Sequence, residues 1–140
     1  MKTVVDVGLP APKQPFSWAV TAPAPVGKNA SQTSKMLFTA HGPVRADGSI
    51  NTGGITEQAR LTFANLDQAV RAAGGTLDDV TQVLIYMLDV TDMPAIDAVY
   101  REFFEAPYPN RSSAAVAGLV VPYMKIEIVA YAMIETKNLI

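Results

Sequence analysis

The chain has 140 residues, of which 49% are hydrophobic and 17% are charged, and its net charge is −2 at pH 7. This balance predicts one folded domain over residues 1–140 and excludes a disordered chain. The absence of cysteine excludes disulfides, thiolate catalysis and cysteine metal sites, and the slight negative charge gives no general attraction to nucleic acid or to a membrane surface.

The first eight residues, Met-Lys-Thr-Val-Val-Asp-Val-Gly, carry an acid early and lack the apolar core of a signal peptide. No run approaches the roughly 20 apolar residues that a membrane helix requires. We therefore expect a soluble, cytoplasmic protein. His41 is the single histidine, which leaves too few nitrogen ligands for an ordinary zinc site, and we expect no bound metal.

The N-terminal part predicts short extended segments. Three prolines keep residues 1–14 as an extended, non-helical arm. A short strand is expected over residues 16–22, loop and turn structure over 22–34, and a second strand over 35–40. A turn then precedes a possible third strand around Ile50.

The clearest helix lies between Glu57 and Ala73. Its apolar residues recur at spacings of three and four, which places them on one face of a helix: Ala59, Phe63, Leu66, Val70 and Ala73. Gly74-Gly75 is expected to end the helix, because glycine adopts the left-handed cap conformation at little cost.

A strand, a second helix and two further strands follow. Residues 80–88 predict a buried strand, and Asp92 is a suitable N-cap for a helix with Pro94 in its first turn. The apolar face of that helix comprises Ile96, Val99, Tyr100 and Phe103. Two strands are expected over residues 111–116 and 124–135.

These elements predict an α+β domain in which two helices cover one face of a sheet. The last strand is nevertheless apolar on both faces, with Ile126, Ile128 and Ala130 on one and Val129, Tyr131 and Met133 on the other. Another copy of the chain is the simplest cover for the second face, so the sequence predicts an oligomer.

Two charged residues of this last third are candidate functional groups. In Tyr108-Pro-Asn-Arg-Ser-Ser, Arg111 stands at the start of a strand, and in Lys125-Ile-Glu-Ile-Val-Ala-Tyr, Glu127 shares a face with apolar neighbours. A carboxylate there loses hydration unless it has a partner or a task. The alternatives are an ion pair of Glu127 with Arg111 or Lys125, and a small ligand on which Arg111 and Glu127 converge.

These two segments resemble the C-terminal signature of the Rid family, the YjgF-type reactive-intermediate deaminases, and the similarity runs from about Pro15 to Ile134. The resemblance implies a chorismate-mutase-like fold, a mixed sheet with two helices on one face. It also implies a homotrimer with a central barrel and ligand clefts between subunits. The resemblance further implies that Arg111 binds the substrate carboxylate and that Glu127 positions the attacking water.

The resemblance also implies a set of substrate-binding residues, in which this chain departs from its relatives. Phe16 falls where relatives frequently carry a tyrosine, and Ser113 where many carry a cysteine. Ala40 stands where a glycine is common, and His41 beside it is more often structural than catalytic. The expected set is Phe16, Thr39, Ala40, His41, Ser112 and Ser113.

The favoured function is hydrolysis of small 2-imino or 2-enamino acids, such as 2-aminoacrylate and 2-iminopropionate, to 2-oxo acids and ammonia, without metal or cofactor. One alternative is a deaminase of a larger enamine such as 2-aminomuconate. Another is a non-catalytic trimer that binds a small carboxylate. A ribonuclease ranks last, because the chain has no basic stripe with interleaved aromatics.

Overall fold

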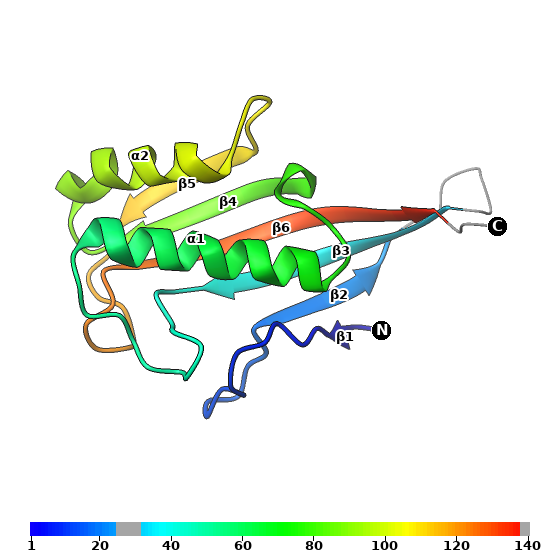
Figure 1. Ribbon diagram of the computed structural model, residues 1–140, viewed down its shortest axis with the longest axis horizontal. Helices are drawn as coiled ribbons and strands as arrows, with labels where there is room; N and C mark the ends of the chain where they lie inside the picture. The colour runs from blue at the N-terminus through cyan, green and yellow to red at the C-terminus, as the bar shows by residue number, and fades with distance from the viewer. Residues whose placement is uncertain (25–31, 138–140) are drawn as a thin grey trace.

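The computed structural model describes residues 1–24 and 32–137, which form one six-stranded sheet with two α-helices on one side (Figure 1). The strands are β1 (Thr3–Val4), β2 (Ala19–Pro23), β3 (Gln32–His41), β4 (Val80–Met87), β5 (Asn110–Ala115) and β6 (Ile126–Lys137). The helices are α1 (Ile55–Ala72) and α2 (Met93–Phe103), with 3-10 turns η1 (Leu77–Asp79) and η2 (Val90–Asp92). The predicted mixed sheet with two helices on one face is confirmed.

The sheet has the strand order β1-β2-β3-β6-β4-β5. All pairings are antiparallel except that of β4 with β5, because the chain crosses over through α2 between these two strands. This crossover makes β5 an edge strand and leaves its start beside α2.

The core lies between the helices and the sheet. α1 packs on β3, β6 and α2, and the apolar stripe that predicted this helix is buried there. Alternate residues of β4 and β6 point to the same side: Val83, Ile85 and Met87, with Ile126, Ile128, Ala130, Ala132 and Ile134. Gly74 has φ +96°, which confirms the expected left-handed end of α1.

The opposite side of the sheet, which we call the open face, is apolar and only partly covered. Phe38 of β3 is 37% exposed there and meets Tyr131 of β6 edge to face, with ring centroids 5.5 Å apart. Val129 and Met133 share this face and are also partly exposed. The predicted apolarity of β6 on both faces is therefore confirmed.

The structure differs from the N-terminal predictions in four details. The strand near Ile50 is only an isolated bridge to Val44. The first predicted strand begins at Ala19, and an additional short strand, β1, lies in the N-terminal arm. β3 begins at residue 32, inside the predicted loop, because it pairs with β6 along its whole length, and this backbone pairing prevails over the polar residues. Residues 25–31 of that predicted loop lie outside the described residues.

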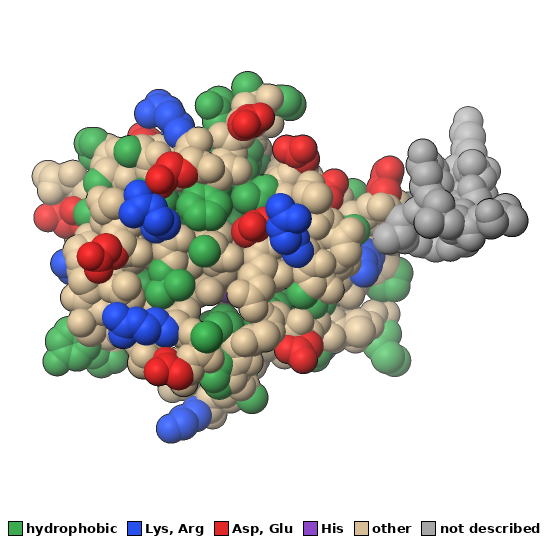
Figure 2. Space-filling model, in the orientation of Figure 1, with side chains coloured by type: hydrophobic (Ala, Val, Ile, Leu, Met, Phe, Trp, Pro, Cys, Tyr) green, Lys and Arg blue, Asp and Glu red, His purple; other side chains and the backbone are tan. Residues whose placement is uncertain are grey.

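The outer surface of the helix layer carries charged side chains of both signs, interspersed rather than separated into patches (Figure 2). None of the helices in the described part of the chain combines the length and the hydrophobicity that crossing a membrane requires.

A buried side-chain amide fixes the start of β6. Gln58 of α1 is fully buried, and its Nε2 donates to the carbonyl oxygens of Tyr123 at 2.9 Å and Gly53 at 3.3 Å. Its Oε1 accepts from the Lys125 backbone N–H at 2.8 Å. Two of these three hydrogen bonds thus set where the chain enters β6, two residues before Glu127, and the third ties the same side chain to the segment before α1.

We expect Gln58→Leu to lower the free energy of unfolding by about 1–3 kcal/mol, because it removes three partly buried hydrogen bonds to the backbone. Gln68→Leu is the matched control, since Gln68 donates a single hydrogen bond, to the Val7 carbonyl at 2.6 Å. Its cost should be smaller, about 0.5–1.5 kcal/mol. Urea unfolding of both variants measures the difference, and equal losses would contradict the role assigned to Gln58.

Candidate active site

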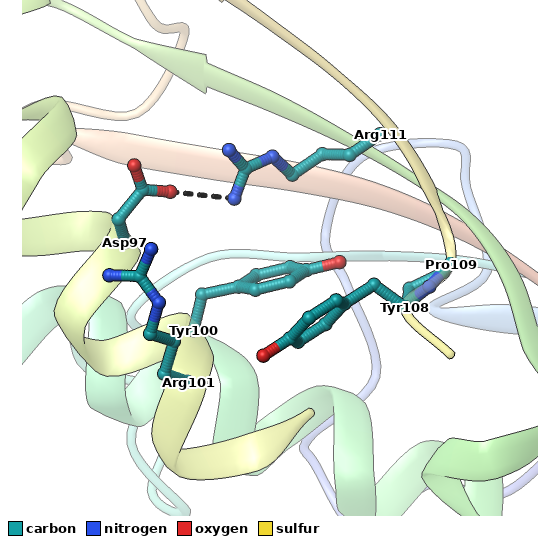
Figure 3. Close-up of a pocket in the computed structure, with 6 residues that line it drawn as sticks. All are labelled: Asp97, Tyr100, Arg101, Tyr108, Pro109 and Arg111. Atoms are coloured by element: carbon teal, nitrogen blue, oxygen red, sulfur yellow. Dashed lines mark hydrogen bonds and ion pairs between the residues drawn. The ribbon is translucent and has the colours of Figure 1, made fainter. Parts of the chain in front are cut away.

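A pocket of about 280 Å³ lies between α2 and the start of β5 (Figure 3). One wall comes from the side of α2 that carries Asp97, Tyr100 and Arg101, and the other from the segment that leads into β5. The lining residues are Asp97, Tyr100, Arg101, Tyr108, Pro109 and Arg111. The pocket therefore combines two guanidinium groups, one carboxylate and two phenol rings.

Arg111 is held in this pocket by two contacts with α2. Its Nη1 donates to Asp97 Oδ1 at 2.7 Å, and its guanidinium carbon lies 4.8 Å from the centroid of the Tyr100 ring. The Arg111 and Asp97 side chains are 30% and 31% exposed, so the pair is partly shielded from water. Nε and Nη2 of Arg111 have no hydrogen-bond partner among the described residues, and these two N–H groups, which form one edge of the guanidinium, can receive both oxygens of a ligand carboxylate.

Tyr100 provides the floor under the guanidinium. The residue is 4% exposed, and its hydroxyl has no hydrogen-bond partner in the described part of the chain. Burial raises the pKa of Tyr100 to about 12, although the positive charge of Arg111 opposes this shift. The phenol is therefore neutral at physiological pH, and its ring face is available to the cation above it.

Glu127 lies on the other side of the sheet from Arg111. Val83 of β4 pairs with both Arg111 and Ala130, so these side chains share the helix side. Glu127 pairs with Tyr86 and points to the open face, because neighbours along a strand alternate. Within one chain the structure does not bring Arg111 and Glu127 together.

Glu127 is half-buried among apolar residues, and this burial raises the pKa of its carboxyl. It forms no salt bridge with any residue in 1–24 or 32–137, so neither of the ion pairs considered for it, with Arg111 or with Lys125, is present there. Its apolar surroundings and lack of a cationic partner leave it more basic than an ordinary glutamate.

The two serines of β5 divide between the faces. Ser113 pairs with the buried Ile85 and shares the helix side with Arg111, whereas Ser112 pairs with Leu84 on the open face. Both are exposed because β5 is an edge strand. Ser113 is therefore the serine that lies beside the Arg111 pocket.

The remaining predicted site residues lie in β3 and in the segment before β2; β3 and β2 are three and four strands from β5, and thus about 14 and 19 Å away across the sheet. Thr39 and His41 are buried on the helix side, and Ala40 points to the open face, beside Val129 of β6. Phe16 is 49% exposed and meets the edge of Trp18 with ring centroids 5.1 Å apart. Within one chain, none of them lines the Arg111 pocket.

His41 is a buried residue with a fixed tautomer. The Thr39 hydroxyl donates to the Trp18 carbonyl at 3.0 Å, so its oxygen accepts from His41 Nε2–H. Trp18 stacks on the imidazole at an interplanar angle of 8°, and His41 Nδ1 has no partner among the described residues. His41 is therefore a buried side chain with one hydrogen-bonded nitrogen and one nitrogen that has no partner among the described residues.

Asp97, Tyr100, Arg101 and Tyr108 were missing from the predicted site. Tyr100 was assigned to the apolar face of its helix, which is correct for its ring. Asp97 and Arg101 stand four residues apart, a spacing that places both on one helical face. That spacing is the available signal, but it is equally common on solvated helix surfaces. Among the described residues, no group of three or more His, Cys, Asp or Glu side chains is placed to share a metal ion.

The family of proteins described as endoribonuclease L-PSP matches residues 12–134 of the chain. The chain belongs to this family. A 2-iminobutanoate/2-iminopropanoate deaminase of Dermatophagoides farinae is 34% identical over 119 residues, covering 81% of this chain and 91% of the relative. A RutC family protein of Pyrococcus horikoshii is also 34% identical, over 79% of this chain and 91% of its own.

Solved structures of the family have the same fold. The crystal structure of Escherichia coli TdcF with bound serine superposes with a TM-score of 0.74 at 29% identity, over 93% of this chain and 97% of TdcF. The Rid resemblance drawn from the C-terminal segments is thereby confirmed.

The state of His41 predicts a specific dependence of stability on pH. Burial lowers the pKa of His41 from 6.5 to about 4. Between these values the unfolded chain binds a proton that the folded chain does not, so stability falls as the pH is lowered through this window. The loss attributable to His41 reaches about 3 kcal/mol at the lower end.

We expect His41→Phe, which keeps a ring beside Trp18, to lose less stability than the wild type between pH 7 and pH 4.5. Urea unfolding at several pH values gives both curves, and carboxylate titrations common to the two proteins cancel in their difference. Parallel curves would show that His41 does not govern this dependence.

Proposed function

We propose that this protein is an imine deaminase, which hydrolyses 2-imino acids and their enamine tautomers to 2-oxo acids and ammonia with protein side chains alone. The observation that carries the proposal is Arg111, which lines an open pocket and is held by Asp97 and Tyr100, while its Nε and Nη2 have no hydrogen-bond partner among the described residues. The activity named for the D. farinae relative and the amino acid bound by TdcF support a small carboxylate ligand.

Arg111 would anchor the substrate. A carboxylate that accepts from Nε and Nη2 forms a planar, bidentate pair, and a hydrogen bond to a charged group contributes about 1.5–3 kcal/mol. The anchored carboxylate fixes the adjacent C=N carbon relative to the pocket walls. Ser113, which lies on the same side of β5, and the neighbouring backbone add polar contacts.

Glu127 would supply acid–base chemistry. Its carboxylate removes a proton from water while the water oxygen bonds to the imine carbon, and the carboxylic acid so formed returns this proton to the imine nitrogen, which becomes an amine. From the resulting carbinolamine the carboxylate takes the hydroxyl proton and passes it to the amine nitrogen, so that the C–N bond breaks, ammonia leaves and the C=O bond of the oxo acid forms. The raised pKa of Glu127 suits this task, because a base works best when its pKa approaches the operating pH.

The sheet separates Arg111 from Glu127 within one chain, so we infer that they meet across a subunit boundary. Arg111 of one protomer would face Glu127 of the partner subunit, with the apolar open face of the sheet buried in the assembly. The partly exposed Phe38–Tyr131 pair and Val129 support such burial. We propose a homotrimer, as the Rid resemblance implies, in which Phe16, Thr39, Ala40 and His41 approach the site from a neighbouring chain or support it.

Turnover of 2-iminopropionate, generated in situ and followed through pyruvate and ammonia, tests the proposed activity. Arg111→Ala should raise KM and lower kcat/KM about tenfold or more, because it removes the anchor. Glu127→Gln should lower kcat by about 10²–10⁴-fold. Arg60→Gln is the control, since Arg60 pairs with Glu102 outside the pocket. If the wild type does not exceed the buffer rate, the proposal fails.

If the wild type binds pyruvate and Arg111→Ala does not, yet no imine is hydrolysed, the protein is the non-catalytic carboxylate-binding trimer of the alternative. In that case Glu127→Gln leaves binding unchanged.

Mixed assemblies test the shared site. When Arg111→Ala and Glu127→Gln chains are unfolded, mixed and refolded together, a site built from two protomers should regain about a quarter of wild-type activity. The reason is that some boundaries then join an intact Arg111 to an intact Glu127. Mixing Arg111→Ala with the double variant is the matched control and should regain none. A mixture as inactive as its parents would place both groups in one protomer.

A further inference from the structure

Glu127 has no charged partner that would fix its position. It forms no salt bridge with any residue in 1–24 or 32–137, and it lies half-buried among apolar neighbours. The place of its carboxyl is therefore set by the backbone at the start of β6. That place matters for a base, because a misplacement of about 1 Å can cost about 10²-fold in rate.

The sheet holds the start of β6 from one side only. The pairing of β3 with β6 ends at Ile128, opposite His41, whereas the pairing with β4 continues to Ile126. Glu127 therefore has a neighbouring strand at β4 and none on the side of β3. The end of a ladder frays more readily than its interior, so this position needs a further support.

The turn that leads into β6 is strained. Among the described residues, Tyr123 is the one non-glycine residue with a positive φ, of 71°, a conformation that a Cβ makes unfavourable. Its side chain is 76% exposed, so the ring is not what holds it. The Tyr123 carbonyl accepts from Gln58 Nε2, and the Lys125 N–H donates to Gln58 Oε1, so one side chain holds the backbone on both sides of Met124.

Gln58 can impose this position because it belongs to the core. It is fully buried in the first turn of α1, and α1 packs on both β3 and β6 (Figure 1). All of its hydrogen bonds go to backbone groups, on the helix side of the sheet. Glu127 points to the open face, so Gln58 acts on its carboxyl through the backbone.

We propose that Gln58 is a positioning residue for catalysis, which holds the strained turn before β6 and thereby fixes Glu127 relative to the bound imine. This inference rests on the proposed function and adds to it a residue on the opposite side of the sheet from the base. Gln58 takes no part in proton transfer and contacts no ligand.

A double-mutant cycle on kcat for 2-iminopropionate tests the inference. Gln58→Leu should lower kcat about tenfold or more, because Glu127 loses its fixed position. In the Glu127→Gln background the same change should alter the remaining kcat by less than about twofold, because the group that Gln58 positions is already absent. Equal fold losses in both backgrounds would show that Gln58 supports only the fold, and would overturn the inference.

Ligand binding separates positioning from general damage. The Kd of pyruvate, measured by calorimetric titration, should stay within about twofold in Gln58→Leu, because the Arg111 pocket is built from α2 and the start of β5. Val70→Ala is the destabilised control, since it leaves a cavity at a fully buried position of the same helix and should keep kcat within about twofold. A loss of pyruvate binding in Gln58→Leu, or an equal loss of kcat in Val70→Ala, would contradict the assignment. If Gln58→Leu does not fold, Gln58→Met, which has an unbranched side chain of similar length, takes its place.

Amide hydrogen exchange tests the support of the strand without turnover. In Gln58→Leu, the backbone N–H groups of residues 124–128 should exchange about tenfold faster or more, while those of β6 beyond residue 130 change less, because only the start of the strand opens. Imine hydrolysis by the wild type, with exchange and kcat unchanged in Gln58→Leu, removes the inference and leaves the deaminase. Faster exchange in Gln58→Leu, without imine hydrolysis by the wild type, removes the deaminase and leaves Gln58 as the residue that places Glu127.

Discussion

The position of Arg111 depends on one pairing, that of the edge strand β5 with β4. Because Arg111 lies opposite the buried Val83, its side chain must leave the sheet on the side of the helices. There it meets Asp97 and Tyr100, which stand three residues apart on α2 and so present an acceptor and a ring face together. A shift of one residue in this register would turn Arg111 to the open face and dismantle the pocket.

The contacts of Arg111 with Asp97 and Tyr100 are strong enough to orient its guanidinium and still leave it able to bind a ligand carboxylate. A partly exposed ion pair stabilises by about 1 kcal/mol at most, and a cation over a phenol ring adds about 0.5–2 kcal/mol. Neither contact uses Nε or Nη2. A ligand carboxylate can therefore bind to a guanidinium that is already held in place, without first breaking the pair with Asp97. The entropy of ordering a long side chain has been lost before the ligand arrives.

The sequence predicted those helices and strands in which the spacing of the hydrophobic residues matches the face that is buried in the structure. The stripe from Ala59 to Ala73 could only be a helix, and the apolar run after residue 80 a buried strand. The face to which Arg111 points could not be read in the same way, because Arg-Ser-Ser-Ala-Ala has no apolar alternation that would fix its phase. The side of the sheet to which Arg111 points is decided by the neighbouring strand β4, in which Arg111 pairs with the buried Val83. Asp97 and Arg101 were equally hidden, since a charged pair at that spacing is ordinary on an exposed helix.

Assembly and acid–base chemistry are physically linked through the open face. Glu127 already has a raised pKa because half of it is buried among apolar side chains. Covering this face with another subunit removes more water from around the carboxyl and moves its pKa further in the same direction. In the proposed assembly, the burial that holds the protomers together would thus also bring the pKa of Glu127 closer to the pH at which a general base is effective. A single chain has the arginine pocket on one side of its sheet and the half-buried carboxyl of Glu127 on the other, and in the proposed assembly association would bring a bound substrate and a base of suitable strength together.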